Sequence, residues 1–228
     1  LIAARNNPII HKEPILNVPS AILIAVSLLG LVHLTIWVAA GSEFANGMLV
    51  AGSFIPARFL ENPISSSYSL ASYSLLHGSA GHLVNNCVWL IAFGSPIASA
   101  LGILRFTVFW IVCASAAALV HFAAGPNSTI PMIGASGAVS GLMGAVVRSG
   151  FRVDVQLKPR HAHAKLPSVA KVLTSRSVLV FLLVYLLINV AIGVGQVNAA
   201  GTSAIAWQAH MGGLFAGFLL FPLFVSRR

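Results

Sequence analysis

Six long apolar runs divide the sequence, and each approaches the roughly 20 residues that a helix needs to cross a bilayer. Turn-forming and charged residues separate the runs. This pattern predicts an all-α membrane protein, a bundle of six transmembrane helices. The predicted spans cover residues 19–40, 69–93, 101–123, 134–151, 176–194 and 204–225.

The basic residues predict how the bundle is oriented. If the six spans are real, every Lys and Arg except Arg58 falls on the same side of the membrane. Basic loops stay in the cytoplasm, so both termini are expected there. The predicted organisation is a cytoplasmic tail over 1–18, a six-helix domain over 19–225 and a second cytoplasmic tail over 226–228.

Composition supports a lipid environment, because 57% of the residues are hydrophobic and only 7% are charged, against about 25% charged in soluble domains. The net charge of +9 follows the membrane topology, so no nucleic-acid partner is expected. The four acids, Glu13, Glu43, Glu61 and Asp154, all fall outside or at the edges of the spans. Their positions argue against a carboxylate proton relay and against a Ser-His-Asp triad. A catalytic serine is therefore expected to work with histidine alone.

Three polar groups are predicted at one depth, near the outer face. His77, His82 and Asn86 lie in the outer half of the second span, Ser136 opens the fourth, and His210 lies about two turns into the sixth. Ionisable residues inside spans are costly, which makes each a functional candidate. A single histidine taken alone is more often a packed, hydrogen-bonded residue, but three such groups at one depth favour a common site.

Small residues indicate which helices can approach each other. Glycines recur at spacings of three and four in the fourth and sixth spans, and this spacing lets helix backbones pack closely in lipid. The fourth span holds Gly134, Gly137, Gly141 and Gly144, and the sixth holds Gly212, Gly213 and Gly217. These two spans are therefore expected to pack together, with Ser136 within reach of His210.

The residue types fit acyl transfer. Serine becomes nucleophilic when a neighbouring neutral imidazole takes its proton. A helix N-terminus at Ser136 favours a developing oxyanion, and His82 and Asn86, one turn apart, can donate further hydrogen bonds. Nucleophile, base and oxyanion donors are then all present.

The sequence resembles the rhomboid family over residues 19–225, in the basic six-helix bacterial form. Three motifs carry the resemblance, in order and on the expected spans. They are Gly134-Ala135-Ser136-Gly137, then Ala209-His210-Met211-Gly212-Gly213 followed by Gly217, and the second-span set His77, His82 and Asn86.

The resemblance implies an intramembrane serine protease. Ser136 would be the nucleophile, His210 the general base and later acid, and His82, Asn86 and the Ser136 N–H the oxyanion hole. His77 would be structural, with Gly134, Gly137 and Gly213 beside the site. Single-pass transmembrane proteins would be the substrates, with no cofactor or metal, and the location would be a bacterial inner membrane.

Two departures from the family pattern concern how the site is held. Ser140 stands where better-studied members often carry a Tyr that stacks on the histidine ring, and the first outer loop lacks a Trp-Arg pair.

Two other functions stay open. A non-catalytic rhomboid-like protein would bind transmembrane segments without cleaving them. A metal-binding membrane protein would use His77, His82 and His210, but a spacing of five places the first two some 140° apart on a helix of about 3.6 residues per turn. His161 and His163 in the basic 4–5 connection are a further, weaker metal candidate.

Overall fold

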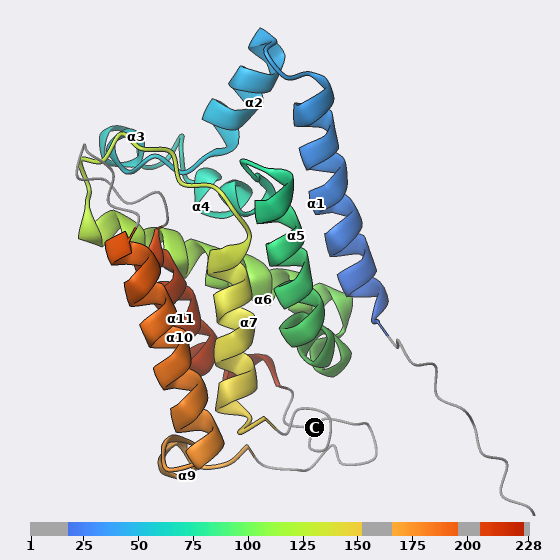
Figure 1. The fold of residues 1–228 in the computed structure, drawn as a ribbon, viewed down its shortest axis with the longest axis vertical. Coiled ribbons are helices and arrows are strands. Elements are labelled where there is room, and N and C mark those ends of the chain that lie inside the picture. The colour runs from blue at the N-terminus through green and yellow to red at the C-terminus, as the bar shows by residue number, and fades with distance from the viewer. Residues whose placement is uncertain (1–17, 152–165, 196–205, 226–228) are drawn as a thin grey trace, which may run out of the picture.

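The computed structural model describes residues 18–151, 166–195 and 206–225 (Figure 1). Within these residues the chain is helical, apart from turns, irregular segments and an isolated antiparallel bridge between Phe54 and Met132. The principal helices of the bundle are α1 (Ser20–Val38), α5 (Ala80–Trp89), α6 (Ser95–Ala124), α7 (Ser136–Arg148), α10 (Arg176–Gly195) and α11 (Trp207–Phe224), and a π-helical turn at Leu90–Gly94 joins α5 to α6. The remaining helices are α2 (Glu43–Gly52), α3 (Pro56–Glu61), α4 (Ser69–Ser72) and α9 (Val169–Leu173).

Each of the six predicted spans overlaps one of the principal helices, although α6 begins six residues before the predicted third span. By length and composition, two helical stretches in the described residues, Ser20–Val38 and Ala80–Ala124, are apolar enough to cross a bilayer. Arg176–Ala191 is a shorter apolar helix. Inside the second stretch the backbone turns sharply at Gly102, with φ 71° and ψ 169°, a conformation that glycine adopts without strain. The predicted end of the second span at residue 93 is therefore wrong, because the helix continues to Leu101 and the turn falls just inside the predicted third span.

The second predicted span, 69–93, is not one continuous helix. Its first part forms α4 and a 3₁₀ turn at Tyr73–Leu75, the chain then leaves the helical path, and α5 starts at Ala80. The restart has a local cause, because Ser79 caps α5 by accepting a hydrogen bond from the His82 N–H at 3.2 Å. His77 therefore precedes α5. The predicted 140° separation between the His77 and His82 side chains is wrong, because it assumed one regular helix.

The first outer loop, which joins the first two predicted spans, contains α2 and α3. Ser42 caps α2 through the Ala45 N–H at 3.1 Å, and Pro56 opens α3, where its missing N–H costs nothing. The Arg58 guanidinium donates to the Val50 carbonyl at 2.7 Å. This arginine therefore anchors the loop to its own backbone, in the absence of a Trp-Arg pair.

Helix α7 lies at the centre of the bundle, packed against α6 and α11 (Figure 1). Every residue from Gly137 to Val147 is buried. The glycines of α11 explain the close approach: a Cβ on Gly213 would collide with the Gly137 carbonyl, and one on Gly217 with the Gly141 carbonyl. The prediction that the fourth and sixth segments pack through small residues is confirmed.

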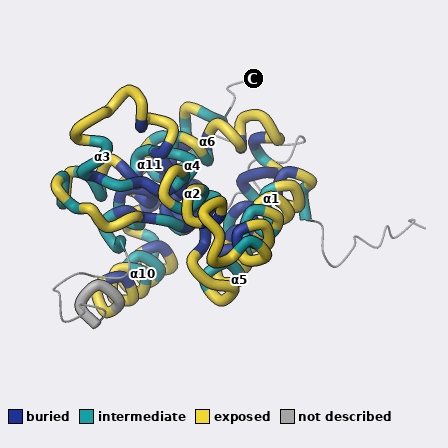
Figure 2. The backbone as a smooth tube through the Cα atoms, turned by 90° about the horizontal axis from the view of Figure 1, so that it is seen from above, coloured by how far each residue is buried: buried dark blue, intermediate teal, exposed yellow. Residues whose placement is uncertain are grey.

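The outer surface of the bundle is apolar. Figure 2 shows buried segments gathered at the centre and exposed ones along α1, α5 and α10. The exposed side chains are large and aliphatic, including Leu31 and Leu34 on α1 and Leu183 and Leu187 on α10. Apolar surface of this extent is typical of helices that face lipid.

Some predicted features lie outside the described residues. They are residues 1–17 of the N-terminal tail, the C-terminal tail 226–228, and His161 and His163 of the basic 4–5 connection.

Candidate active site

Ser136 is the first residue of α7, and the segment before it is held from two sides. The Gly134 N–H donates to the Tyr73 carbonyl at 3.0 Å, and the Ala135 N–H approaches His77 Nε2 at 3.5 Å. His77 is almost fully buried, with 2% of its surface exposed. Its contact with Ala135 supports the structural role that the family resemblance implied.

Gly134 is the position in this segment where glycine is required. Its φ of +120° is one that L-residues rarely adopt, and a Cβ there would lie 2.7 Å from Cε1 of His82. The backbone thus runs directly against the His82 ring and enters α7 with Ser136 exposed to the cavity described below.

His210 projects from the first turn of α11 onto Ser136. Its Nε2 lies 2.8 Å from Ser136 Oγ, which is hydrogen-bond distance. The two residues are 74 positions apart in sequence, and the glycine contacts between α7 and α11 bring them together. The expectation that Ser136 lies within reach of His210 is confirmed.

The other ring nitrogen of His210 has a partner that the sequence reasoning missed. Nδ1 lies 2.6 Å from Oδ1 of Asn189 on α10. No carboxylate was expected beside this histidine, and the structure places an amide there. The signal was available, because Asn189 is a lone polar residue within a long apolar run, where such residues usually pair across helices.

Ser140 and Tyr185 of α10 form hydrogen bonds that hold the site in place, although the tyrosine that other family members carry after the serine is absent. Ser140 Oγ donates to the Ser136 carbonyl at 2.7 Å and accepts from the Tyr185 hydroxyl at 2.6 Å. Tyr185 is also 3.4 Å from the His210 carbonyl. Tyr185 of α10 therefore contacts α7 through Ser140 and α11 through the His210 carbonyl.

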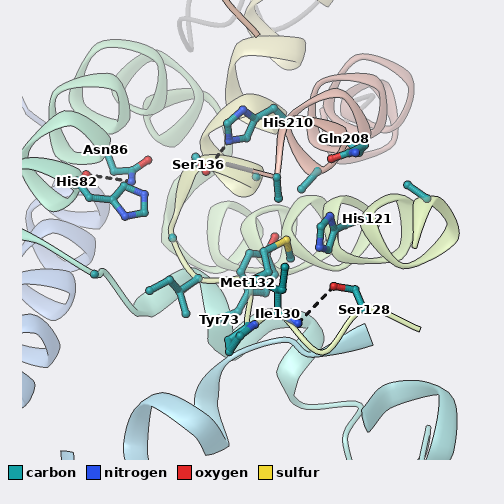
Figure 3. Close-up of a pocket in the computed structure, with 18 of the residues that line it drawn as sticks. Tyr73, His82, Asn86, His121, Ser128, Ile130, Met132, Ser136, Gln208 and His210 are labelled. Carbon is teal, nitrogen blue, oxygen red and sulfur yellow. Dashed lines mark hydrogen bonds between the residues drawn. The ribbon is translucent and has the colours of Figure 1, made fainter. Parts of the chain in front are cut away.

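His82 and Asn86 lie on α5, across the same cavity from His210. Figure 3 shows them facing Ser136 from one side, with His210 on the other. The cavity has a volume of about 590 Å³, and all four side chains line it. Asn86 is buried, and its amide donates to the His82 carbonyl at 3.1 Å, which fixes the orientation of the amide group.

This geometry gives little support to the alternative function, a metal-binding membrane protein. The rings of His77 and His82 do meet, with centroids 5.0 Å apart, because His77 precedes α5. Across the described ranges 18–151, 166–195 and 206–225, no group of three or more His, Cys, Asp or Glu side chains is placed to hold a metal ion.

Comparison with known proteins identifies the fold. Residues 65–227 match the Rhomboid domain, so the chain belongs to the rhomboid family of membrane proteins, which includes intramembrane serine proteases and inactive homologues. The match covers the segments that carry His77, His82, Asn86, Ser136 and His210. A search of curated proteins found no significant match.

Proposed function

We propose that this protein is an intramembrane serine endopeptidase that cleaves transmembrane segments through Ser136 and His210. The observation that carries the proposal is the 2.8 Å contact between Ser136 Oγ and His210 Nε2 at a helix N-terminus that lines a cavity. Nucleophile, base and oxyanion donors that converge on one point define an acyl-transfer site. Because inactive homologues share the fold, the fold alone does not indicate activity. The Ser136–His210 pair is the feature that supports it.

In the acylation step, His210 Nε2 takes the Ser136 hydroxyl proton as Oγ attacks the carbonyl carbon of the scissile peptide bond. The tetrahedral intermediate carries its negative charge on the former carbonyl oxygen. His210 then gives the proton to the leaving amine, which breaks the C–N bond and leaves an acyl ester on Ser136. In the second half a water molecule, deprotonated by His210, attacks the ester carbonyl carbon. His210 then returns the proton to Ser136 Oγ as the C–Oγ bond breaks, which releases the carboxylic acid product and restores the serine.

The oxyanion would be stabilised from two directions. The Ser136 N–H belongs to the first turn of α7, whose N–H groups have no partner within the helix, and the helix dipole adds positive potential. The His82 ring and the Asn86 amide face the same space from α5. Hydrogen-bond donors stabilise a developing negative charge more strongly where water is excluded.

The membrane setting follows from the family and the apolar surface. We propose that the six predicted spans cross the bilayer with both termini in the cytoplasm, and that the membrane is a bacterial inner membrane. The substrates would be single-pass transmembrane proteins, and the mechanism requires no metal or cofactor.

Replacing Asn86 with leucine, which has a similar size, is expected to lower kcat by about 100- to 1,000-fold, because one oxyanion donor is lost. KM should change little, since the interaction forms mainly in the transition state. Steady-state cleavage in proteoliposomes measures both constants. Asn46→Leu, at an exposed amide on α2, is the matched control. Equal kcat in the two variants would remove Asn86 from the oxyanion hole.

The function itself is tested with purified protein reconstituted in liposomes together with reporter single-pass substrates. The proposal predicts cleavage inside the membrane segment, mapped by mass spectrometry of both fragments, at a rate unchanged by EDTA. Cleavage that EDTA abolishes and zinc restores would favour the metal alternative. Tight binding of the reporters without cleavage would favour a non-catalytic family member.

A further inference from the structure

Asn189 is a buried polar residue on a helix that is otherwise strongly apolar. It has 4% of its surface exposed, whereas its neighbours Ile188 and Val190 are 52% and 44% exposed. A polar amide removed from water costs free energy unless its hydrogen bonds are satisfied. Both ends of the Asn189 amide are satisfied, and each end has a different partner.

The first partner fixes which way the amide points. Asn189 Nδ2 donates to the Tyr185 carbonyl, one turn earlier on α10, at 2.8 Å. Exchanging the amide oxygen and nitrogen would place two carbonyl oxygens against each other, so this contact determines the assignment. The Asn189 Oδ1 atom is therefore the atom that faces His210.

The second partner fixes the proton on the imidazole. Oδ1 of an amide can only accept, and it lies 2.6 Å from His210 Nδ1, so that nitrogen must carry the hydrogen. In a neutral imidazole the hydrogen on Nδ1 leaves Nε2 with a free lone pair. Nε2 is the atom 2.8 Å from Ser136 Oγ. The tautomer that Asn189 selects is thus the one that can accept the serine proton.

We infer that Asn189 is a positioning residue that holds His210 as the Nδ1–H tautomer, oriented toward Ser136. The inference rests on the proposed serine-protease function and deepens it, because it adds a third side chain to the Ser136–His210 pair. Once His210 has taken the serine proton, both ring nitrogens carry hydrogen, and the Asn189 carbonyl dipole continues to accept from Nδ1. The amide therefore favours the protonated ring without placing a charge in the membrane.

A purely structural role is the competing explanation, in which Asn189 only ties α10 to α11. The two explanations differ in what they predict for the tautomer and for the separation of kcat from KM. A structural tie would alter stability and leave the proton on His210 unspecified. A positioning role predicts a defined tautomer and a loss confined to the chemical step.

The first test is the tautomer in the unmodified protein. Protein labelled with ¹⁵N-histidine is reconstituted in bilayers, and His210 is assigned among the eight histidines by comparison with His210→Gln. We expect a protonated Nδ1 and an unprotonated Nε2 at a pH where the ring is neutral. A neutral His210 found with its proton on Nε2 would overturn the inference. The tautomer measurement does not require cleavage activity, so its result is independent of whether the proposed protease function holds.

The second test compares Asn189→Leu with Asn189→Asp. Leucine removes the acceptor at similar size and should lower kcat by about 10- to 100-fold, as misplaced catalytic groups do, with KM changed by less than about threefold. In Asn189→Leu the ¹⁵N spectrum should show a mixture of tautomers. Aspartate keeps an acceptor for Nδ1 but loses the hydrogen bond to the Tyr185 carbonyl, so it should restore part of the lost kcat. Ile188→Ala, at the exposed neighbour on the same helix, is the control.

Wild-type kcat and an unchanged tautomer in Asn189→Leu would contradict the positioning role. If Asn189→Leu does not fold, Asn189→Ala removes the same acceptor without adding bulk, and the tautomer of the unmodified protein still decides the question. If the unmodified protein shows the Nδ1–H tautomer but cleaves nothing, the proposed function fails while the assignment of Asn189 to the imidazole proton stands.

Discussion

Replacing Ser136 with alanine is expected to lower kcat for cleavage of a transmembrane substrate by about 1,000-fold or more. The same loss is expected for His210→Ala, because Ser136 Oγ and His210 Nε2 act as one unit across their 2.8 Å contact. Removing either member leaves binding and the oxyanion donors in place but no activated nucleophile. The double variant should therefore be no slower than either single variant.

The measurement is single-turnover cleavage in proteoliposomes, with thermal unfolding recorded for every variant. Both alanine variants should remain folded, and His210→Ala should lower the unfolding temperature more than Ser136→Ala, because it also removes the hydrogen bond between α11 and Asn189 of α10. Losses that multiply in the double variant would show that the two residues act separately. Cleavage by Ser136→Ala at the unmodified rate would contradict the assignment of the nucleophile.

Replacing Gly217 with alanine is expected to cost about 3–5 kcal/mol of unfolding free energy, at the upper end of single substitutions. The added Cβ would collide with the Gly141 carbonyl and lie 2.7 Å from Gly141 Cα. Backbone cannot move aside as the end of a flexible side chain can, so α11 would have to shift away from α7. Because α11 carries His210 and α7 carries Ser136, cleavage should fall along with stability.

Gly30→Ala is the matched control, because a Cβ on Gly30 in α1 has no atom within 4 Å. It should leave stability unchanged or raise it by up to about 1 kcal/mol, as expected where alanine replaces an unconstrained helical glycine. Unfolding of both variants in detergent micelles gives the comparison. If Gly217→Ala and Gly30→Ala change the unfolding free energy by the same amount, the close packing of α7 on α11 is wrong.

The sequence predicted the helical segments well where hydrophobicity alone determines them. The apolar runs at 19–40 and 176–194 correspond to α1 and α10 almost residue for residue. The break after Leu75 was missed, because the run is apolar enough to continue as a helix. The deciding features are local: the Ser79 cap on α5 and the buried contact of His77 with Ala135.

The candidate site was predictable to the extent that its residues are unusual in a membrane segment. Ser136 and His210 stood out because polar groups at one depth and glycines at helix-packing spacing converge on them. Asn189 was missed for a chemical reason. Carboxylates were the expected partners of an imidazole, but an uncharged amide can also accept its Nδ1 hydrogen. Tyr185 could not be anticipated, since only the packing of α10 places its hydroxyl on Ser140.

The most direct test of the serine mechanism is covalent labelling with a fluorophosphonate, which traps an activated serine as fluoride leaves phosphorus. The reconstituted protein is treated, digested and analysed by mass spectrometry to locate the adduct. We predict an adduct on Ser136 that is absent in Ser136→Ala and strongly reduced in His210→Ala. An adduct on another serine, or labelling that persists in Ser136→Ala, would contradict the assignment of Ser136 as the nucleophile.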